Sequence, residues 1–474
     1  MENFWESNVW GFFNILAVVL MSILAANTLK RKIPFLKQSL IPTSVLAGTV
    51  LLIISSIYNA FAETPFFDTK PFAGSGYAYL EMITYHTLAL GFIAATLKTT
   101  KSHLNKKRTV EIFNTGVTTV ATYLLQGAVG LGITIIAALI VKDFFSSAGI
   151  LLAFGYGQGT GQAMNYGMIY EELGFTGGKS FGLTVAAFGF LCASFGGVIH
   201  LNVLKKKGKI LKHSGELERI DMDEVQSPND IPMQASVDKI SIQIAFITLS
   251  YFIAYLIMLV LGKLLPGMRA VIYGFNFLLG VLAATVVKLT VNLLKKKKLM
   301  NHEYLNNFLL TRLSNFFYDI MVVAGIAAIR LDLLENYWGI IAIICSVGMV
   351  ITYVYNRIVA KTLFKDYAEE QFLAMYGMLT GTASSGIILL REIDGEFKTP
   401  VADNLVYQNF PAIVFGFPLM LLANWAPKAT VTVALILAGF FIVMNVILFR
   451  SKIFKRRGNG GSPEQKETVE ETAN

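Results

Sequence analysis

The most constraining feature of the chain is a series of apolar runs, each about 20 residues long and nearly free of charged side chains. A run of that length forms a helix that crosses a bilayer, whose hydrocarbon core is about 30 Å thick. Charged residues make up 15% of the 474-residue chain, whereas a soluble domain carries about 25%. The sequence therefore predicts a polytopic membrane protein and excludes a soluble enzyme, a secreted module and a nucleic-acid-binding protein.

Eleven of these runs are long enough to be transmembrane helices. They cover approximately residues 9–29, 38–60, 78–97, 109–141, 180–203, 240–262, 270–294, 304–329, 337–360, 404–425 and 429–450. Two further apolar segments, about 147–170 and 367–390, are rich in Gly, Ser and Thr, which makes each a weak span. We predict an all-α polytopic membrane protein with about 11 transmembrane helices, in which these two segments are re-entrant hairpins.

Lys and Arg are distributed unevenly between the loops. If the N-terminus is external and neither hairpin crosses the membrane, 26 Lys and Arg residues fall in cytoplasmic stretches and 7 in external ones. The cytoplasmic stretches are 30–37, 98–108, 205–212, 295–298, 357–365 and 450–457. Because cytoplasmic loops carry the excess of positive charge, the pattern favours non-crossing hairpins, an external N-terminus and a cytoplasmic C-terminus. It also explains the net charge of +9 without a nucleic-acid partner.

A polar stretch over residues 204–239 divides the membrane region into halves, 1–203 and 240–425. Its mixed charge predicts a cytoplasmic linker. An additional C-terminal span, within residues 426–450, follows the second half. The tail at 451–474 has the composition of a disordered cytoplasmic segment.

Short matches at a constant separation of 220 residues relate the two halves. They are Gly161-Gln162-Ala163 with Gly381-Thr382-Ala383, Glu172 with Glu392, and Phe195-Gly196 with Phe415-Gly416. Five spans and one hairpin in each half give an odd number of crossings, so the second half is predicted to be inverted. Inverted repeats with interrupted helices are typical of secondary transporters.

The Gly-rich hairpins have the composition of a binding site. Irregular backbone at membrane depth is tolerated only where it is buried in protein or lines a cavity. Free N–H groups at the start of a half-helix suit a carboxylate, and free carbonyls at the end of another suit Na⁺. The alternative is that the glycines only permit tight helix packing. The predicted substrate contacts are Gln158, Gly159, Thr160, Gly161, Gln162, Asn165, Thr380, Gly381, Thr382, Ser384, Ser385 and Arg391.

The predicted Na⁺ ligands are Gln126, Gly157, Gly377, Asn409 and Asp319. Gln126 either ligates the ion or makes an interhelical hydrogen bond. Asn409 is predicted to face the core because the 220-residue offset pairs it with Gly189. Asp319 is a carboxylate inside a predicted span, which suggests an ion site; the alternative is a structural pair with Arg312.

Other side chains around the hairpins have alternative roles. Arg391 either takes a substrate carboxylate through two hydrogen bonds, pairs with Glu392, or extends to the cytoplasmic interface. Tyr156, Tyr166 and Tyr376 border the hairpins, where we expect them to pack rather than to gate.

The motifs around the first hairpin match those of a known family. They are Phe154-Gly155-Tyr156-Gly157-Gln158-Gly159-Thr160-Gly161-Gln162-Ala163, the upstream set Gln126, Ala128, Gly130 and Gly132, the downstream set Tyr170, Gly174, Phe175 and Thr176, and Phe35-Leu36-Lys37 with Ile41-Pro42 near the N-terminus. At these residues the chain resembles the bacterial sodium/glutamate symporter family, over about residues 10–425 and most clearly over 120–200. The resemblance implies a homodimer in a bacterial inner membrane with a Na⁺-driven elevator mechanism. The hairpins and neighbouring spans would form its moving core.

The hairpins depart from the family pattern. Gln158 stands where the family's first hairpin, Ser-Gly-Gly-His-Gly-Thr-Gly-Ala-Ala, has histidine. The second hairpin, at residues 377–386, lacks the proline of the family's Gly-Phe-Gly-Leu-Gly-Ala-Thr-Pro-Thr-Ala. These departures bear on which substrate is carried rather than on the transporter architecture.

The sequence predicts Na⁺-coupled symport of glutamate or a related amino acid or small carboxylate. H⁺ coupling or antiport is the nearest alternative, and a non-transporting receptor is another. Asp319 stands nearly alone in the spans, which favours Na⁺ held by carbonyls and hydroxyls over a carboxylate proton site. No Walker A or HExxH motif is present, and Cys192 and Cys345 lack ligand spacing. We therefore expect no enzyme activity, no cofactor beyond the coupling ion, and as partners the bilayer and a small anionic or zwitterionic substrate.

Overall fold

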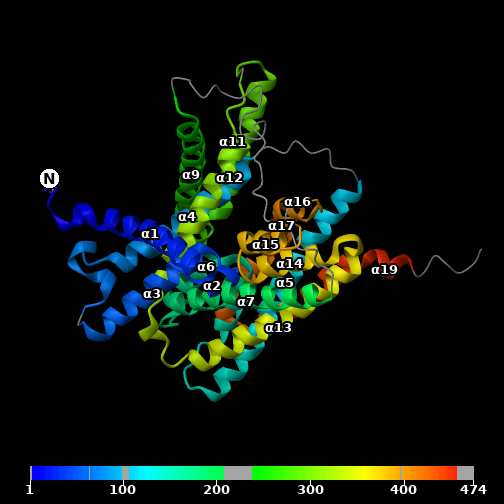
Figure 1. The fold of residues 1–474 in the computed structure, drawn as a ribbon, viewed down its shortest axis with the longest axis horizontal. Helices are drawn as coiled ribbons and strands as arrows, with labels where there is room; N and C mark the ends of the chain where they lie inside the picture. The colour runs from blue at the N-terminus through cyan, green and yellow to red at the C-terminus, as the bar shows by residue number, and fades with distance from the viewer. Residues whose placement is uncertain are drawn as a thin grey trace, which may run out of the picture.

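The computed structural model describes residues 3–62, 64–98, 106–207, 237–300, 302–394 and 398–455. Within these residues every regular element is a helix and there is no β-strand. The prediction of an all-α protein is therefore confirmed for the described residues (Figure 1). Most of the predicted linker and most of the predicted tail, residues 456–474, lie outside them.

Ten helices of the described residues are long and apolar enough to cross a membrane. They are α1 (Ser7–Lys32), α3 (Thr43–Phe61), α4 (Gly76–Leu97), α5 (Lys106–Ile140), α7 (Gly178–Lys206), α9 (Lys239–Leu264), α11 (Asn276–Lys296), α12 (Asn307–Ala327), α13 (Trp338–Leu363) and α18 (Thr430–Leu448). Each coincides with a predicted span, so the chain is a multi-pass membrane protein by length and composition of its helices. The short helices α2 (Pro34–Gln38), α10 (Arg269–Gly274) and α19 (Arg450–Lys455) lie between or after them.

The remaining predicted span, 404–425, is a bent pair of helices. These are α16 (Val401–Tyr407) and α17 (Asn409–Trp425), with a bend of 49° between them. Pro411 lies in the first turn of α17 and has no N–H to continue the hydrogen-bond ladder from α16. The pair makes an eleventh span if it is counted as one.

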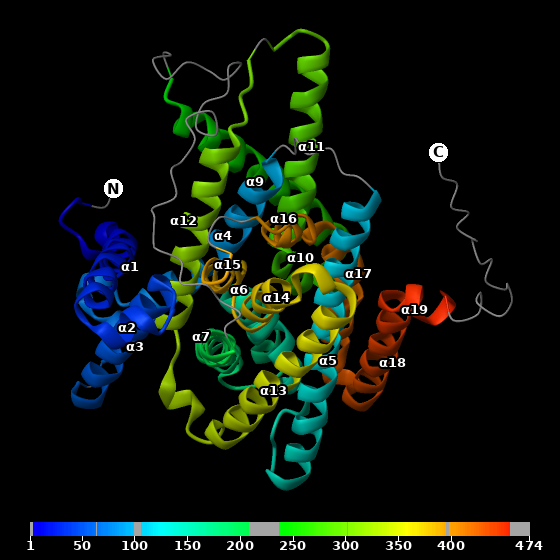
Figure 2. The ribbon, with the colours of Figure 1, turned by 45° about the vertical axis from the view of Figure 1, so that its right-hand side comes forward.

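The helices pack in two groups (Figure 2). The outer group consists of α1, α3, α4, α9, α10, α11 and α12, which pack mainly on one another. The hairpin group consists of α5, α7, α13, α16, α17 and α18 together with the two predicted hairpin segments. These segments form α6 (Leu151–Glu172), and α14 (Ala368–Thr380) with α15 (Ala383–Arg391). Contacts between the groups come mainly from α6, which touches α4, α10 and α12.

Helix α6 folds back on itself at Gly159. This residue has φ 79° and ψ −171°, which interrupts the helix between two arms. Phe154 and Tyr166 lie 12 residues apart, which is about 18 Å along a straight helix. Their rings nevertheless stack with centroids 3.9 Å apart. The first hairpin is therefore a pair of antiparallel helical arms with Gly159 near its tip.

The second hairpin depends on a close approach of two glycines. A Cβ on Gly377 would lie 2.9 Å from the Cα of Gly386, and a Cβ on Gly386 would lie 2.4 Å from the carbonyl oxygen of Ala374. Helices α14 and α15 thus pack backbone to backbone, with Gly381 and Thr382 between them. Only glycine fits this approach.

Helix α7 runs across both hairpins on a face of small residues. Gly182, Gly189 and Gly196 recur every seven residues, or about two helical turns, so they share one face. A Cβ at these positions would lie 2.4 Å from Ala163 O, 2.3 Å from Thr380 O and 2.1 Å from the Tyr376 hydroxyl, respectively. The same helix therefore fixes the position of both hairpins.

The additional C-terminal span, α18, belongs to the hairpin group. It packs along α5. Near its start, the Thr430 hydroxyl lies 2.9 Å from the Ser147 hydroxyl in the short turn before α6. Just beyond its end, Arg450 Nη1 donates to Asn114 Oδ1 of α5 at 3.0 Å. The span is thus attached to the hairpin group at both ends.

We predict that Gly386→Ala destabilises the protein by about 1–3 kcal/mol, the usual cost of overpacking, because the new methyl group would meet the Ala374 carbonyl. The measurement is the melting temperature of the purified protein in detergent, by intrinsic fluorescence. Gly439→Ala in α18 is the matched control, since a Cβ there meets nothing within 4 Å. Equal melting temperatures for the two variants would contradict the close packing of α14 on α15.

Candidate functional site

The tips of the two hairpins meet inside the protein. A Cβ built on Gly159 would lie 3.5 Å from Cγ2 of Thr382, so the two tips are in van der Waals contact. Thr160 is fully buried, and its hydroxyl donates to the carbonyl oxygen of Met321 in α12 at 3.3 Å. The meeting point therefore lies between the hairpin group and the outer group.

Several buried polar atoms around this meeting point have no hydrogen-bond partner. Both polar atoms of the Gln162 amide lack one, although the residue is only 1% exposed. The same holds for the hydroxyl of Ser385, at the start of α15. Buried polar groups are almost always hydrogen-bonded in native proteins. These atoms are therefore available to a ligand, an ion or water.

The start of α15 offers further donors. Thr382 is its N-cap residue, but the side chain makes no capping hydrogen bond. The first N–H groups of a helix have no partner within the helix, and they carry a partial positive charge. In α15 these groups begin at Ala383, next to the tip contact, which suits a carboxylate.

Most of the predicted substrate contacts lie together at the hairpin tips, whereas Asn165 and Arg391 lie away from them. Residues 158–162 and 380–385 lie at the two tips. The Asn165 amide instead donates to the carbonyl of Gly274, at the end of α10, at 3.2 Å. Arg391 is the last residue of α15 and is exposed. It lies nine residues beyond Thr382, or about 13 Å along a helix.

Among the predicted cation ligands, Gln126 lies beside the second tip. It is fully buried, and its Nε2 donates to Thr352 Oγ1 at 2.8 Å and to the carbonyl of Leu379 at 2.9 Å. The Gly157 carbonyl accepts from the Tyr123 hydroxyl at 3.0 Å. Gly377 is in the close contact between α14 and α15 described above.

Asn409 does not face the core, contrary to the prediction from the repeat. It is exposed, and its Oδ1 accepts from Nε2 of Gln408 at 2.9 Å. Gln408 is 1% exposed and takes the inward position instead. The bend between α16 and α17 explains the difference, because a constant sequence offset does not account for a change of helix direction.

Asp319 lies apart from the hairpin tips. It is exposed on α12, beside the Ser44 hydroxyl of α3. The alternative pair with Arg312 is not formed, since the Arg312 guanidinium lies over the Phe308 ring, 5.0 Å from its centroid. The three tyrosines pack as expected: Tyr156, Tyr166 and Tyr376 are buried. Their hydroxyls donate to backbone carbonyls of other helices.

Polar residues on the faces of α5 and α13 next to Gln126 were not among the residues predicted from sequence. They are Thr122, Thr352 and Asn356, which are 0%, 0% and 2% exposed, respectively. The available signal was spacing, because Thr122 and Gln126, like Thr352 and Asn356, are four residues apart and share a helix face. Within the described residues no three His, Cys, Asp or Glu side chains form a possible metal site.

A charged cluster holds the base of the second hairpin. The Glu369 carboxylate, in the first turn of α14, pairs with Arg357 of α13 and lies 3.0 Å from Nε2 of His200 of α7. His200 Nδ1 lies 2.7 Å from the Tyr353 hydroxyl. Burial raises the pKa of Glu369, but hydrogen bonds from Arg357 and His200 outweigh it and lower the pKa to about 2. The carboxylate therefore stays ionised at neutral pH and joins three helices.

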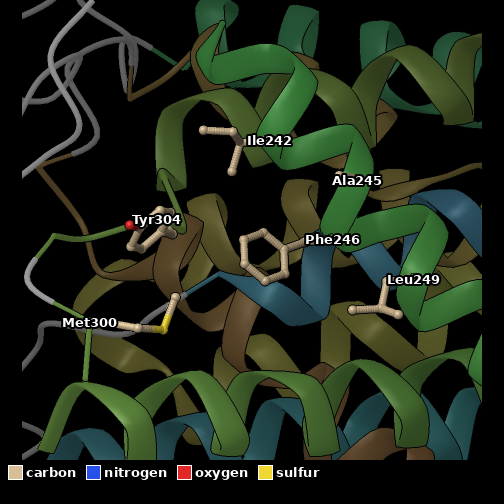
Figure 3. Close-up of a pocket in the computed structure, with 6 residues that line it drawn as sticks. All are labelled: Ile242, Ala245, Phe246, Leu249, Met300 and Tyr304. Carbon is tan, nitrogen blue, oxygen red and sulfur yellow. The ribbon is translucent and has the colours of Figure 1, made fainter. Parts of the chain in front are cut away.

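A surface pocket on the outer group has a different character (Figure 3). It is lined by Ile242, Ala245, Phe246, Leu249, Met300 and Tyr304. All but Tyr304 are apolar, and α9 exposes many apolar side chains around it. This pocket suits a lipid chain rather than a charged substrate.

A comparison of the chain with protein-family models gave no match, and a comparison with curated proteins gave none either. The assignment of a function therefore depends on the geometry of the site and on the resemblance noted above.

Gly159→Ala is expected to disorder the first tip, because its φ and ψ are essentially restricted to glycine and cost other residues about 1–3 kcal/mol. The measurement is hydrogen–deuterium exchange over residues 151–172, which should become faster than in the native protein. Gly132→Ala, where a Cβ meets nothing within 4 Å, serves as the control. Unchanged exchange in Gly159→Ala would refute a strained tip.

Glu369→Gln should lower the melting temperature, because each hydrogen bond to a charged group contributes about 1.5–3 kcal/mol and the three side chains are at most 20% exposed. Asp366→Asn is the matched control. Its ion pair with Lys107 is solvent-exposed at 72% and 75%, and such pairs contribute little. If both variants melt alike, the cluster does not stabilise the base of the hairpin.

Proposed function

We propose that the protein is a secondary active transporter that imports glutamate or a related amino acid or small carboxylate together with Na⁺. The observation that carries this proposal is the contact between two helical hairpin tips with unpartnered buried polar atoms around it. An interrupted helix inside a membrane protein is stable only when its free backbone groups are buried in protein or face a cavity. Interrupted helices of this kind bind substrate and ions in transporters.

An anionic substrate group is favoured by the donors at the tips. The first N–H groups of α15 point toward the meeting point of the hairpins, and Thr382 leaves them uncapped. The Gln162 amide adds buried donors and acceptors without partners. An amino-acid carboxylate would meet the N–H groups, and the amide would meet a second polar group of the substrate.

Equivalent positions in the two hairpins support an internal repeat, which in this proposal is inverted. Phe154 contacts Tyr166 in the first hairpin, and Ala374 contacts Gly386, each 220 residues later, in the second. Tyr156 and Tyr376 have the same separation, and each donates its hydroxyl to a carbonyl of another helix. In this proposal the hairpin group moves against the outer group as an elevator in a homodimer, as the resemblance implies.

Na⁺ is favoured over H⁺ as the coupling ion by the chemistry near the tips. The buried polar groups there are amides, hydroxyls and carbonyls, which are suitable ligands for Na⁺ but do not titrate. Glu369 is already ion-paired, and Asp319 is exposed on α12. Cation coupling can drive accumulation, because one charge moving across 100 mV contributes about 2.3 kcal/mol.

The test is uptake of labelled L-glutamate into proteoliposomes under an inward Na⁺ gradient, with unlabelled amino acids and dicarboxylates as competitors. We expect Na⁺-dependent uptake of glutamate or of one of the competitors. Uptake that depends on a proton gradient and not on Na⁺ would show that H⁺ is the coupling ion. Binding without uptake would indicate a receptor and contradict transport.

A matched variant links uptake to the hairpin tips. Gln162→Leu should reduce uptake at least about tenfold, which corresponds to about 1.4 kcal/mol of lost binding. Its melting temperature without substrate should not fall, because the amide has no partner to lose. Uptake by this variant at the native rate would contradict a contact between Gln162 and the substrate.

A further inference from the structure

Helices α5 and α13 cross antiparallel through two pairs of polar residues. Gln126 of α5 donates through Nε2 to Thr352 Oγ1 of α13 at 2.8 Å. One turn away, Asn356 of α13 donates through Nδ2 to Thr122 Oγ1 of α5 at 3.4 Å and to the Thr352 carbonyl at 2.9 Å. All four residues are at most 2% exposed. Both amides contact Thr352, so they are close neighbours.

Acceptors outnumber donors at this crossing. The side-chain oxygens of Gln126 and Asn356 are buried and have no hydrogen-bond partner. The Thr122 hydroxyl proton is already donated to the Thr118 carbonyl at 2.8 Å. The two amide nitrogens donate to four further oxygens, including the carbonyl of Leu379 at 2.9 Å from Gln126. The crossing therefore holds six oxygens, counting the two amide oxygens, and those two receive no hydrogen bond.

We propose that this crossing binds a monovalent cation with the size and coordination of Na⁺. Its ligands are the side-chain oxygens of Gln126, Asn356, Thr122 and Thr352 and the Leu379 carbonyl. The ion enters as the two amides rotate to present oxygen in place of nitrogen. All these ligands are neutral, which suits a single charge, whereas divalent cations prefer carboxylate ligands.

The site deepens the proposed function, because it specifies how the coupling ion acts on the substrate site. Leu379 immediately precedes Thr380 at the second tip. A cation that ligates its carbonyl fixes this tip against α5 and α13. Substrate and ion then each strengthen the binding of the other, as the reciprocity of coupled sites requires.

A buried water molecule is the competing occupant, since it can donate to both amide oxygens. The two occupants can be distinguished because the binding of water does not depend on the Na⁺ concentration. Purified protein is therefore melted in detergent across a series of NaCl concentrations, with choline chloride keeping the ionic strength constant. The expected result is a saturable rise of the melting temperature with Na⁺, because a ligand that binds only the folded state stabilises it.

Variants of Asn356 test whether the stabilisation by Na⁺ arises at this crossing. Asn356→Leu should raise the Na⁺ concentration for half-maximal stabilisation at least about tenfold, because it removes a ligand. Asn356→Asp should lower that concentration, because it adds a charged ligand. A misfolded variant would not show this tighter Na⁺ binding. Asn276→Leu in α11 is the control, since it removes another fully buried amide whose oxygen lacks a partner. It should leave the half-maximal Na⁺ concentration unchanged.

Three results would overturn the site: a melting temperature independent of Na⁺, an unaltered Na⁺ response in both Asn356 variants, or an equal loss of response in Asn276→Leu. The measurement needs no transport, so the two proposals can fail separately. If uptake is driven by Na⁺ but the Asn356 variants keep the native stabilisation by Na⁺, only this site is rejected. A Na⁺ response that depends on Asn356, without Na⁺-driven uptake, would reject only symport.

Discussion

The structure depends on satisfying backbone groups where two helices are interrupted inside an apolar bundle. Each interruption, at Gly159 and at Gly381–Thr382, frees N–H and carbonyl groups that lipid cannot satisfy. The fold meets this requirement by bringing the two tips together and burying them against α7 and α12. What remains unsatisfied there is a small set of side-chain amides and hydroxyls. The same constraint that shapes the fold thus produces a place for a polar ligand.

Close backbone packing makes this arrangement rigid. The seven-residue spacing of Gly182, Gly189 and Gly196 lets one helix touch both hairpins, and the Gly377–Gly386 contact closes the second hairpin. The ionic cluster around Glu369 joins α7, α13 and α14 at the base of that hairpin. Helix α18 is attached to the turn before α6 near its start and to α5 just beyond its end. The hairpins are therefore parts of a single packed unit.

Much of the fold follows from the sequence, because span length and apolar composition do not depend on tertiary contacts. Both Gly-rich segments also fold back as hairpins near the predicted bounds. The misplaced residue, Asn409, shows the limit of a repeat: the bend before Pro411 turns Gln408 inward instead. The crossing of Gln126 with Thr352 and the pairing of Glu369 with His200 join residues 226 and 169 positions apart. No local pattern encodes such pairs, because they depend on how helices cross.

The central claim is that the two hairpin tips form the substrate site. The most direct measurement is an experimental density map of the protein in lipid nanodiscs with saturating Na⁺ and substrate. The account predicts both tips at membrane depth, with substrate density between residues 158–162 and 380–385. Continuous membrane-crossing helices in place of the hairpins, or substrate bound elsewhere while the tips remain in contact, would contradict it.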